Sequence, residues 1–461
     1  MKKLILNFIL MIFVCTCIGQ KNDIEFVIRQ IKENYPGFKE KTTDKDFDIY
    51  VSKILSMGSS KDTFWMASKL VNFFSDKHLQ IYDINVRNHI DSALCKQNLY
   101  EVKKYFASSI KYLKKYEGFW VNDYGNCIIA LRKTSNNPVS YRSYIIESRN
   151  NSLLPGFVNM ELEQKKDNVF DTHYTGPSGN AFVYLTSLVK NDSTIICGNF
   201  SKWHKLNNYE FPYLPYVKKF NDTVSTKVIN DSCFLITIPA CSKQNADMMD
   251  SIINTNKAKI ERSKTLIIDI RNNTGGTVRT YYPLLPYIYT NPIKTVDGDT
   301  YCSESSIREE KESLEAYKKR PKADTGRIAH WIKNINEMEA HKGGFIFSPG
   351  PTQKYDSIKK YPKNVALIIN YGCASAAELM VLDFKQSTKV KTFGENTAGV
   401  VDYLDFYSQE TPSKKYLLYT PETRRTVTKT QPKYDGKGIE PDVKIADNTK
   451  DWIRFVEEYY K

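Results

Sequence analysis

Residues 265–276, TLIIDIRNNTGG, decide how the chain folds. The first six residues are mostly apolar and rich in β-branched side chains, which is typical of a strand buried on both faces of a sheet. A glycine pair follows, and glycines let the backbone turn sharply and leave N–H groups pointing outward at the strand end. Most such turns are only turns, but outward N–H groups also suit an oxyanion. The stretch therefore predicts a buried strand with a candidate anion site at its end.

A second stretch, residues 365–384, has the same build and reads VALIINYGCASAAELMVLDF. Its apolar run leads into a turn, and Ser375 then heads an apolar helix with Glu378 three residues on. Serine at a helix start with glutamate at the third position is a capping box, which is the interpretation that this stretch alone favours. A nucleophile at this place would also gain from the helix dipole, because the dipole stabilises the negative tetrahedral intermediate.

Two further blocks follow in the chain, GENTAG at 394–399 and GKGIEPD at 436–442. Together with DIRNNTGG and SAAE, in this order, they resemble peptidase family S41, which includes the tail-specific (C-terminal processing) proteases and the tricorn core protease. The resemblance covers residues 265–442. It implies a ClpP/crotonase-like α/β fold with Ser375 as the nucleophile. It also implies an oxyanion hole formed by the glycine turn and the N–H after the nucleophile, which here are Gly275, Gly276 and Ala376.

The general base departs from the pattern of the processing proteases. In those proteins a lysine follows the GENTAG-like block, but here Val400 and Val401 stand in that place. In the tricorn-like branch the base is a histidine located after a helix and just before a strand, which is the context of His78. Histidine suits this role because its ordinary pKa of about 6.5 leaves it mostly neutral and able to accept the serine proton. That branch has a serine before the histidine, whereas this chain has Lys77.

The partner that orients this histidine is left open between two carboxylates. A carboxylate is expected to hold the imidazole and to stabilise the imidazolium during catalysis. Asp435 and Glu440 flank the glycines of the last block, and the tricorn-like acid lies just upstream of the matching glycine, which favours Asp435. Asp-Gly is also a strong turn dipeptide, so Asp435 has an ordinary structural interpretation as well.

The N-terminus has the layout of a secretory signal peptide over residues 1–19. Two lysines precede an apolar run at 4–14 and a small-residue exit at 17–19. The run is too short to cross a bilayer as a helix, which needs about 20 residues. We therefore expect an exported protein, periplasmic or extracellular, with a lipid anchor on Cys15 or Cys17 as the alternative to ordinary cleavage.

Three regions are expected after the signal peptide: an N-terminal helical domain at 20–116, a small β-rich domain at 117–222, and an α/β catalytic domain at 223–461. Apolar residues at helical spacing mark the first region, and short aromatic and β-branched runs mark the second. Within the third, the charged stretch 304–341 is expected to form helices inserted over the core.

Composition narrows the range of partners. The formal net charge is +14, but the lysines are interleaved with acidic residues rather than gathered, which favours a solvated surface over nucleic-acid binding. The seven cysteines beyond residue 19 show no metal-ligand spacing, and an odd count over so long a chain specifies no disulfide. No metal or cofactor is expected.

The sequence thus predicts a serine-type endopeptidase that cleaves a protein or peptide substrate through an acyl-enzyme. The alternative on the same fold is a catalytically inactive peptide- or lipid-binding protein. An acyl-CoA enzyme of the crotonase type conflicts with export. An α/β-hydrolase esterase conflicts with the sequence GCASA at 372–376, which is not the GxSxG elbow. Substrate, oligomeric state and the purpose of the β-rich region stay open.

Overall fold

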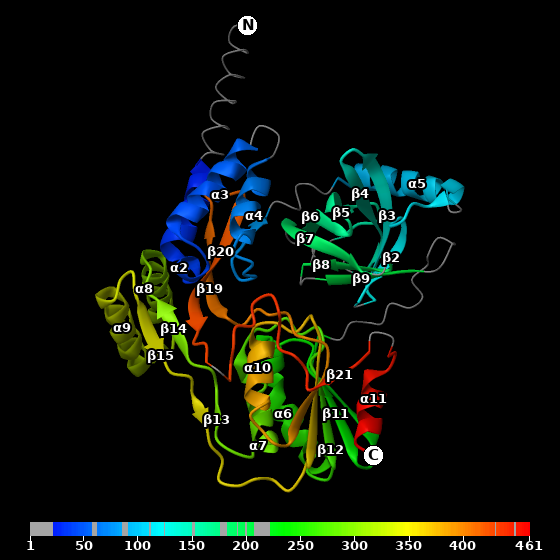
Figure 1. Ribbon diagram of the computed structural model, residues 1–461. Helices are drawn as coiled ribbons and strands as arrows, with labels where there is room; N and C mark the ends of the chain where they lie inside the picture. The colour runs from blue at the N-terminus through cyan, green and yellow to red at the C-terminus, as the bar shows by residue number, and fades with distance from the viewer. Residues whose placement is uncertain are drawn as a thin grey trace.

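Figure 1 shows the computed structural model, which describes residues 22–57, 62–84, 91–109, 112–123, 125–149, 153–175, 182–190, 192–198, 201–206, 222–428, 430–446 and 449–461. The predicted signal peptide at 1–19, with its two candidate anchor cysteines, lies outside these residues. The described chain forms a helical N-terminal part, a β-barrel and an α/β domain.

The α/β domain is built on a six-stranded sheet in the order β10-β11-β12-β17-β18-β21. Every pair in it is parallel except β10 with β11. The two predicted buried strands are central members, since β12 covers Thr265–Asp269 and β17 covers Asn364–Ile369. The remaining strands are β10 (Ser225–Asn230), β11 (Cys233–Thr237), β18 (Val390–Gly394) and β21 (Val443–Lys444).

Helices cover both faces of this sheet (Figure 1). Leu266 and Ile268 of β12 pack with α6 (Lys243–Ile260) and α10 (Ala376–Phe384). Ile267, between them, packs with α11 (Trp452–Tyr459) on the other face. Successive residues of a strand point to opposite faces, so a continuous apolar run is what a strand between two helical layers needs. The α/β class predicted for the catalytic domain is confirmed.

Short elements connect these layers. After β12 the chain forms η3 (Val278–Thr280), η4 (Tyr282–Leu284) and α7 (Leu285–Ile288). β13 (Ile293–Lys294) and β16 (Thr352–Gln353) then pair antiparallel at the two ends of the long insertion that precedes β17. The insertion therefore leaves and re-enters the domain at one place.

The middle of the chain is a closed antiparallel barrel of the strands β2 to β9. Each strand pairs with the next in sequence, and β9 pairs back with β2. The small β-rich domain is thus confirmed. α5 (Ser92–Ser109) packs on the barrel through Val102 and Phe106, so the chain joins the barrel before residue 117. The strands are β2 (Gly118–Asn122), β3 (Cys127–Asn136), β4 (Val139–Ser148), β5 (Val158–Lys166), β6 (Val169–Thr175), β7 (Phe182–Lys190), β8 (Thr194–Cys197) and β9 (Ser201–Lys205).

The N-terminal part is helical, and its last turn reaches the C-terminal part of the chain. A helix at 22–34 precedes α2 (Phe38–Lys41), α3 (Asp44–Ser56) and α4 (Thr63–Asn72). The turn containing His78 then leads into β1 (Gln80–Asp83), as the apolar pattern predicts. β1 pairs antiparallel with β20 (Tyr416–Arg425), which also pairs with β19 (Tyr403–Glu410). Strand pairing therefore fixes the His78 turn next to the loops of the α/β domain.

The charged insertion does form two helices, α8 (Glu304–Lys318) and α9 (Thr325–Ala340), but they do not lie over the catalytic core. Their apolar residues Ile307 and Met338 pack with Cys302 and Ile346. These belong to a small sheet edge formed by β14 (Gly298–Tyr301) and β15 (Phe345–Ser348), which extends from β20. Figure 1 shows the pair beside the N-terminal helices. A charged stretch predicts exposed helices but does not indicate which surface they cover.

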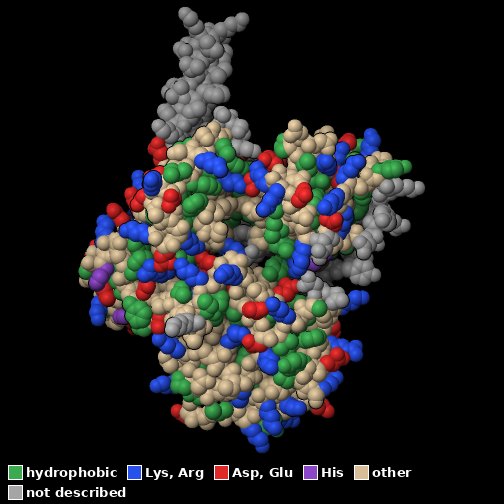
Figure 2. All heavy atoms as spheres, viewed as in Figure 1, with side chains coloured by type: hydrophobic (Ala, Val, Ile, Leu, Met, Phe, Trp, Pro, Cys, Tyr) green, Lys and Arg blue, Asp and Glu red, His purple; other side chains and the backbone are tan. Residues whose placement is uncertain are grey.

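The visible surface mixes both signs of charge, with Lys and Arg side chains interspersed with Asp and Glu (Figure 2). The seven cysteines of the described residues are all buried and unbridged. No helix in the described part of the chain is long and apolar enough to cross a bilayer.

Candidate active site

The turns that follow β12 and β17 meet at the carboxyl end of the sheet. A methyl group on Gly275 would come 2.8 Å from the Cβ of Ser375 and 2.9 Å from the N of Ala376. Gly275 also has a φ of +97°, so its backbone and its surroundings both require glycine. The structure thus brings together the serine and the glycine turn, which are far apart in the chain.

Asparagine side chains fasten the two turns to each other. The N–H of Asn272 donates to Oδ1 of Asn370 at 2.8 Å, and Nδ2 of Asn370 donates back to Oδ1 of Asn272 at 2.9 Å. The N–H of Ala374 donates to the backbone carbonyl of Asn273 at 3.0 Å. No sequence motif assigns a role to these asparagines. The available signal was their position, because each follows a buried strand at the edge where parallel neighbours end together.

Ser375 adopts a backbone conformation that non-glycine residues avoid, with φ of 55° and ψ of −121°. Such a conformation costs about 1–3 kcal/mol and persists only where the surrounding structure enforces it. The residue sits between β17 and α10, on a sharp strand-to-helix turn that presents its side chain beyond the sheet. A nucleophile elbow has this geometry, although the sequence around Ser375 lacks the GxSxG pattern.

Glu378 confirms part of the capping interpretation and does more. The N–H of Ser375 donates to Oε2 of Glu378 at 3.2 Å. The same carboxylate accepts from the hydroxyl of Thr397 at 2.6 Å and from the N–H groups of Gly399 at 2.9 Å and Val400 at 2.7 Å. Its complete burial raises the pKa of Glu378, and these hydrogen bonds work against that rise. The GENTAG block is therefore a loop held against the nucleophile turn by one buried carboxylate.

The candidate oxyanion hole differs from the prediction at one donor. The N–H of Gly275 donates to Oδ1 of Asn273 at 2.9 Å, so this donor is already engaged. Among the described residues, the N–H groups of Gly276 and Ala376 make no hydrogen bond. Gly276 is exposed, and Ala376 opens α10, where the helix dipole favours negative charge. The geometry therefore favours Gly276 and Ala376 as donors and gives Gly275 the task of close packing.

His78 is held in one tautomer by the backbone. Its Nδ1 lies 2.6 Å from the carbonyl oxygen of Tyr403, and a carbonyl can only accept, so Nδ1 carries the proton when the ring is neutral. The lone pair is then on Nε2, as a general base requires. The N–H of His78 donates to Oδ1 of Asp76 at 2.9 Å, and the ring stacks on Phe406. Within the described residues, no hydrogen bond joins Ser375 to His78.

Neither predicted carboxylate holds the imidazole. Asp435 pairs with Lys41 at 2.8 Å instead. Burial, followed by the nearby charge of Asp76, raises the pKa of Asp435 to about 7. The side chain of Glu440 is 64% exposed and pairs with Lys444 on the surface. The Tyr403 carbonyl occupies the position that the sequence assigned to a carboxylate, and no side-chain pattern could have indicated a backbone oxygen.

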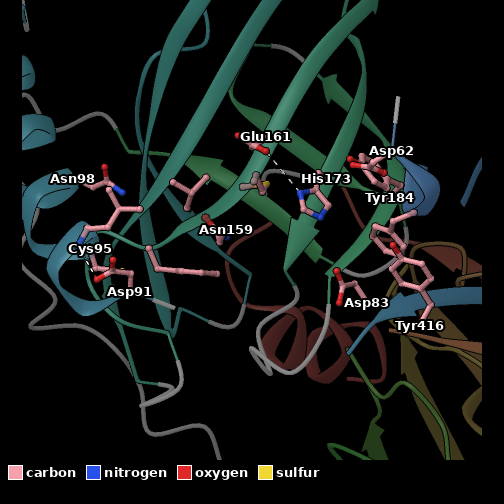
Figure 3. A pocket seen from close by; sticks show the side chains of 15 residues that line it. Asp62, Asp83, Asp91, Cys95, Asn98, Asn159, Glu161, His173, Tyr184 and Tyr416 are labelled. Carbon is pink, nitrogen blue, oxygen red and sulfur yellow. Dashed lines mark hydrogen bonds and ion pairs between the residues drawn. The ribbon is translucent and has the colours of Figure 1, made fainter. Parts of the chain in front are cut away.

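A separate cavity of about 370 Å³ lies between the barrel and the N-terminal part, and Figure 3 shows its lining. It contains none of the predicted site residues. His173 and Glu161 face one another in it, 3.8 Å apart. Its one thiol, Cys95, has its pKa raised by burial and then by Asp91, so it is protonated rather than nucleophilic. The predicted nucleophile and oxyanion donors therefore lie at the two turns and outside this cavity.

The two turns lie in a part of the chain that matches a known protein family. Peptidase family S41 matches residues 233–445, which include both turns and the GENTAG and GKGIEPD blocks. The described residues contain no cluster of His, Cys, Asp or Glu that could hold a metal ion. No curated protein matches the chain.

Several solved structures are similar to the chain at low identity. A putative peptidase from Parabacteroides merdae ATCC 43184 is 13% identical, with 96% of each chain covered and a TM-score of 0.44. Mature CPAF in complex with lactacystin is 12% identical, with 93% of this chain and 94% of that chain covered and a TM-score of 0.49. The photosystem II D1 C-terminal processing protease is 10% identical, covering 93% and 92%, with a TM-score of 0.39. The match to peptidase family S41 thus covers residues 233–445 of the chain.

Proposed function

We propose that the chain is a serine-type endopeptidase that uses Ser375 as its nucleophile and His78 as its general base. The family match at 233–445 supports peptide-bond hydrolysis in general. The observation that carries the finer proposal is the strained Ser375, which lies against Gly275. Among the described residues, the N–H groups of Gly276 and Ala376, which follow Gly275 and Ser375 in the chain, make no hydrogen bond. Strain at one serine beside an unused pair of donors is what acyl transfer needs.

The proposed reaction proceeds through an acyl-enzyme. The Ser375 hydroxyl attacks the scissile carbonyl carbon while Nε2 of His78 takes its proton. The N–H groups of Gly276 and Ala376 hold the resulting oxyanion, and the Tyr403 carbonyl accepts from Nδ1 of the imidazolium. The C–N bond then breaks as His78 returns the proton to the leaving amine. Water, activated by His78, hydrolyses the ester and restores the serine.

A fluorophosphonate probe tests this proposal on the full-length protein, because such probes react with activated serines. Wild-type protein is expected to become labelled, Ser375→Ala to lose all labelling, and His78→Ala to react about 10²–10⁴-fold more slowly. Ser52→Ala on α3, an exposed helical serine, is the matched control and should react like wild type. Folded wild-type protein that does not react would overturn the proposal and favour a binding protein on the same fold.

A further inference from the structure

Lys77 places its amine between the turn of the proposed base and the loop beside the nucleophile. Its Nζ donates to the carbonyl oxygen of Ala398 at 2.5 Å. The charged groups that face it are Glu378 of α10, Asp435 of the turn before Gly436, and Asp76 of its own turn. Lys77 and His78 are adjacent, so whatever fixes Lys77 also fixes the backbone that carries the imidazole.

The contact with Ala398 continues to the nucleophile by two routes. The N–H of Ala398 donates to the carbonyl of Cys373 at 2.8 Å, two residues before Ser375. The N–H groups of Gly399 and Val400 donate to the carboxylate of Glu378, which also accepts from the N–H of Ser375. Ala398 is therefore hydrogen-bonded to the nucleophile turn through its N–H and to Lys77 through its carbonyl.

Burying this amine is costly. Burial lowers the pKa of Lys77 to about 8, and the three carboxylates act in the opposite direction. A lysine has a long flexible stem and could place its charge in water instead. The contact with a single backbone carbonyl is a poor source of stability, so a functional role is the better explanation for it.

We infer that Lys77 is a positioning residue of the proposed peptidase, whose ammonium clamps the 397–400 loop to the His78 turn and so sets the imidazole against Ser375. This inference rests on the function proposed above. Its Nζ contacts the Ala398 carbonyl and makes no hydrogen bond with Ser375 among the described residues, so it is not placed to accept a proton from the serine.

The test measures the second-order rate of fluorophosphonate labelling against pH for wild type, Lys77→Met and Lys77→Arg. Lys77→Met is expected to label about 10–100-fold more slowly, because a small displacement of the base is costly. Wild type should lose rate above pH 8 as the ammonium deprotonates. Lys77→Arg should keep most of the rate and lack this alkaline loss, because arginine stays charged. Lys45→Met, an exposed lysine on α3, is the matched control and should not change the rate.

Two results would overturn the inference. A Lys77→Met protein that labels like wild type would show that the clamp is not needed. Loss of labelling in both variants, with a wild-type rate that rises through pH 8, would make Lys77 the base itself. If Lys77→Met fails to fold, the alkaline limb of Lys77→Arg still decides. The function proposed above fails separately, through a Ser375→Ala protein that still reacts.

Discussion

The two turns at the candidate site follow neighbouring parallel strands, yet they use different residues where the backbone adopts a positive φ. The 271–276 turn places Gly275 and Gly276 at φ of +97° and +130°, which glycine adopts without steric strain. The turn after β17 places Ser375 at φ of 55° and ψ of −121°, where any side chain is strained. A turn that supplies only N–H groups can use glycine, whereas a turn that must present a hydroxyl has to accept the strain. The difference marks Ser375 as the residue whose side chain matters.

Apart from loss of the proposed nucleophile, the largest effect is expected from giving the glycine turn a side chain. Gly275→Ala would put a methyl group 2.6 Å from the carbonyl oxygen of Ala374 and 2.8 Å from the Cβ of Ser375. One of the two turns must shift, and we expect labelling by the fluorophosphonate to fall by at least about 10²-fold. Destabilisation of about 1–3 kcal/mol should appear in urea unfolding.

Gly343→Ala is the control for backbone strain alone. Gly343 has a φ of +79°, and a methyl group there would meet nothing within 4 Å. It should cost about 1 kcal/mol of stability and leave labelling unchanged. Equal labelling by the two alanine variants would mean that the close contact between the turns is not required for activity.

A smaller effect should come from relieving strain in the serine turn. Ser375→Gly and Ser375→Ala both lack the hydroxyl, but only glycine fits the observed backbone. We expect Ser375→Gly to be more stable than Ser375→Ala by about 1 kcal/mol in urea unfolding, since the relieved strain exceeds the entropy cost of glycine.

The same pair of substitutions at Ser52 should give the opposite order. Ser52 is an exposed residue inside α3, where alanine is favoured over glycine by about 1 kcal/mol. If alanine were also the more stable substitution at position 375, the comparison between the two turns would lose its basis.

The sequence predicted the local parts of this site because local patterns specify them. Apolar runs and glycine pairs indicated β12, β17 and their turns, and the change of period around His78 indicated a helix, a turn and a strand. It could not predict what depends on distant segments coming together. The hydrogen bond between Nδ1 of His78 and the carbonyl of Tyr403 is of this kind. The surface covered by α8 and α9 was predicted wrongly for the same reason.

The smallest effect on activity is expected at Asp435, whose carboxylate pairs with Lys41 and makes no hydrogen bond with His78 or Ser375 among the described residues. Asp435→Asn should change fluorophosphonate labelling by less than about threefold, because the Tyr403 carbonyl and not this carboxylate holds His78. Its effect should appear in stability against pH instead. The pKa of Asp435 is raised to about 7, so between about pH 4 and pH 7 the folded state binds more protons than the unfolded state. The free energy of unfolding of wild type should therefore decline as the pH rises from about 4 to about 7.

Asp435→Asn removes this proton uptake, so its unfolding free energy should decline less steeply with pH than that of wild type. The slope is the relevant quantity, because the substitution also removes the ion-pair partner of Lys41 and so changes the stability itself. Urea unfolding at intervals between pH 4 and pH 8 measures it. Parallel curves for the two proteins would show that Asp435 titrates alike in both states. A strong loss of labelling would return this carboxylate to the catalytic apparatus and extend the site beyond the two turns and the His78 turn.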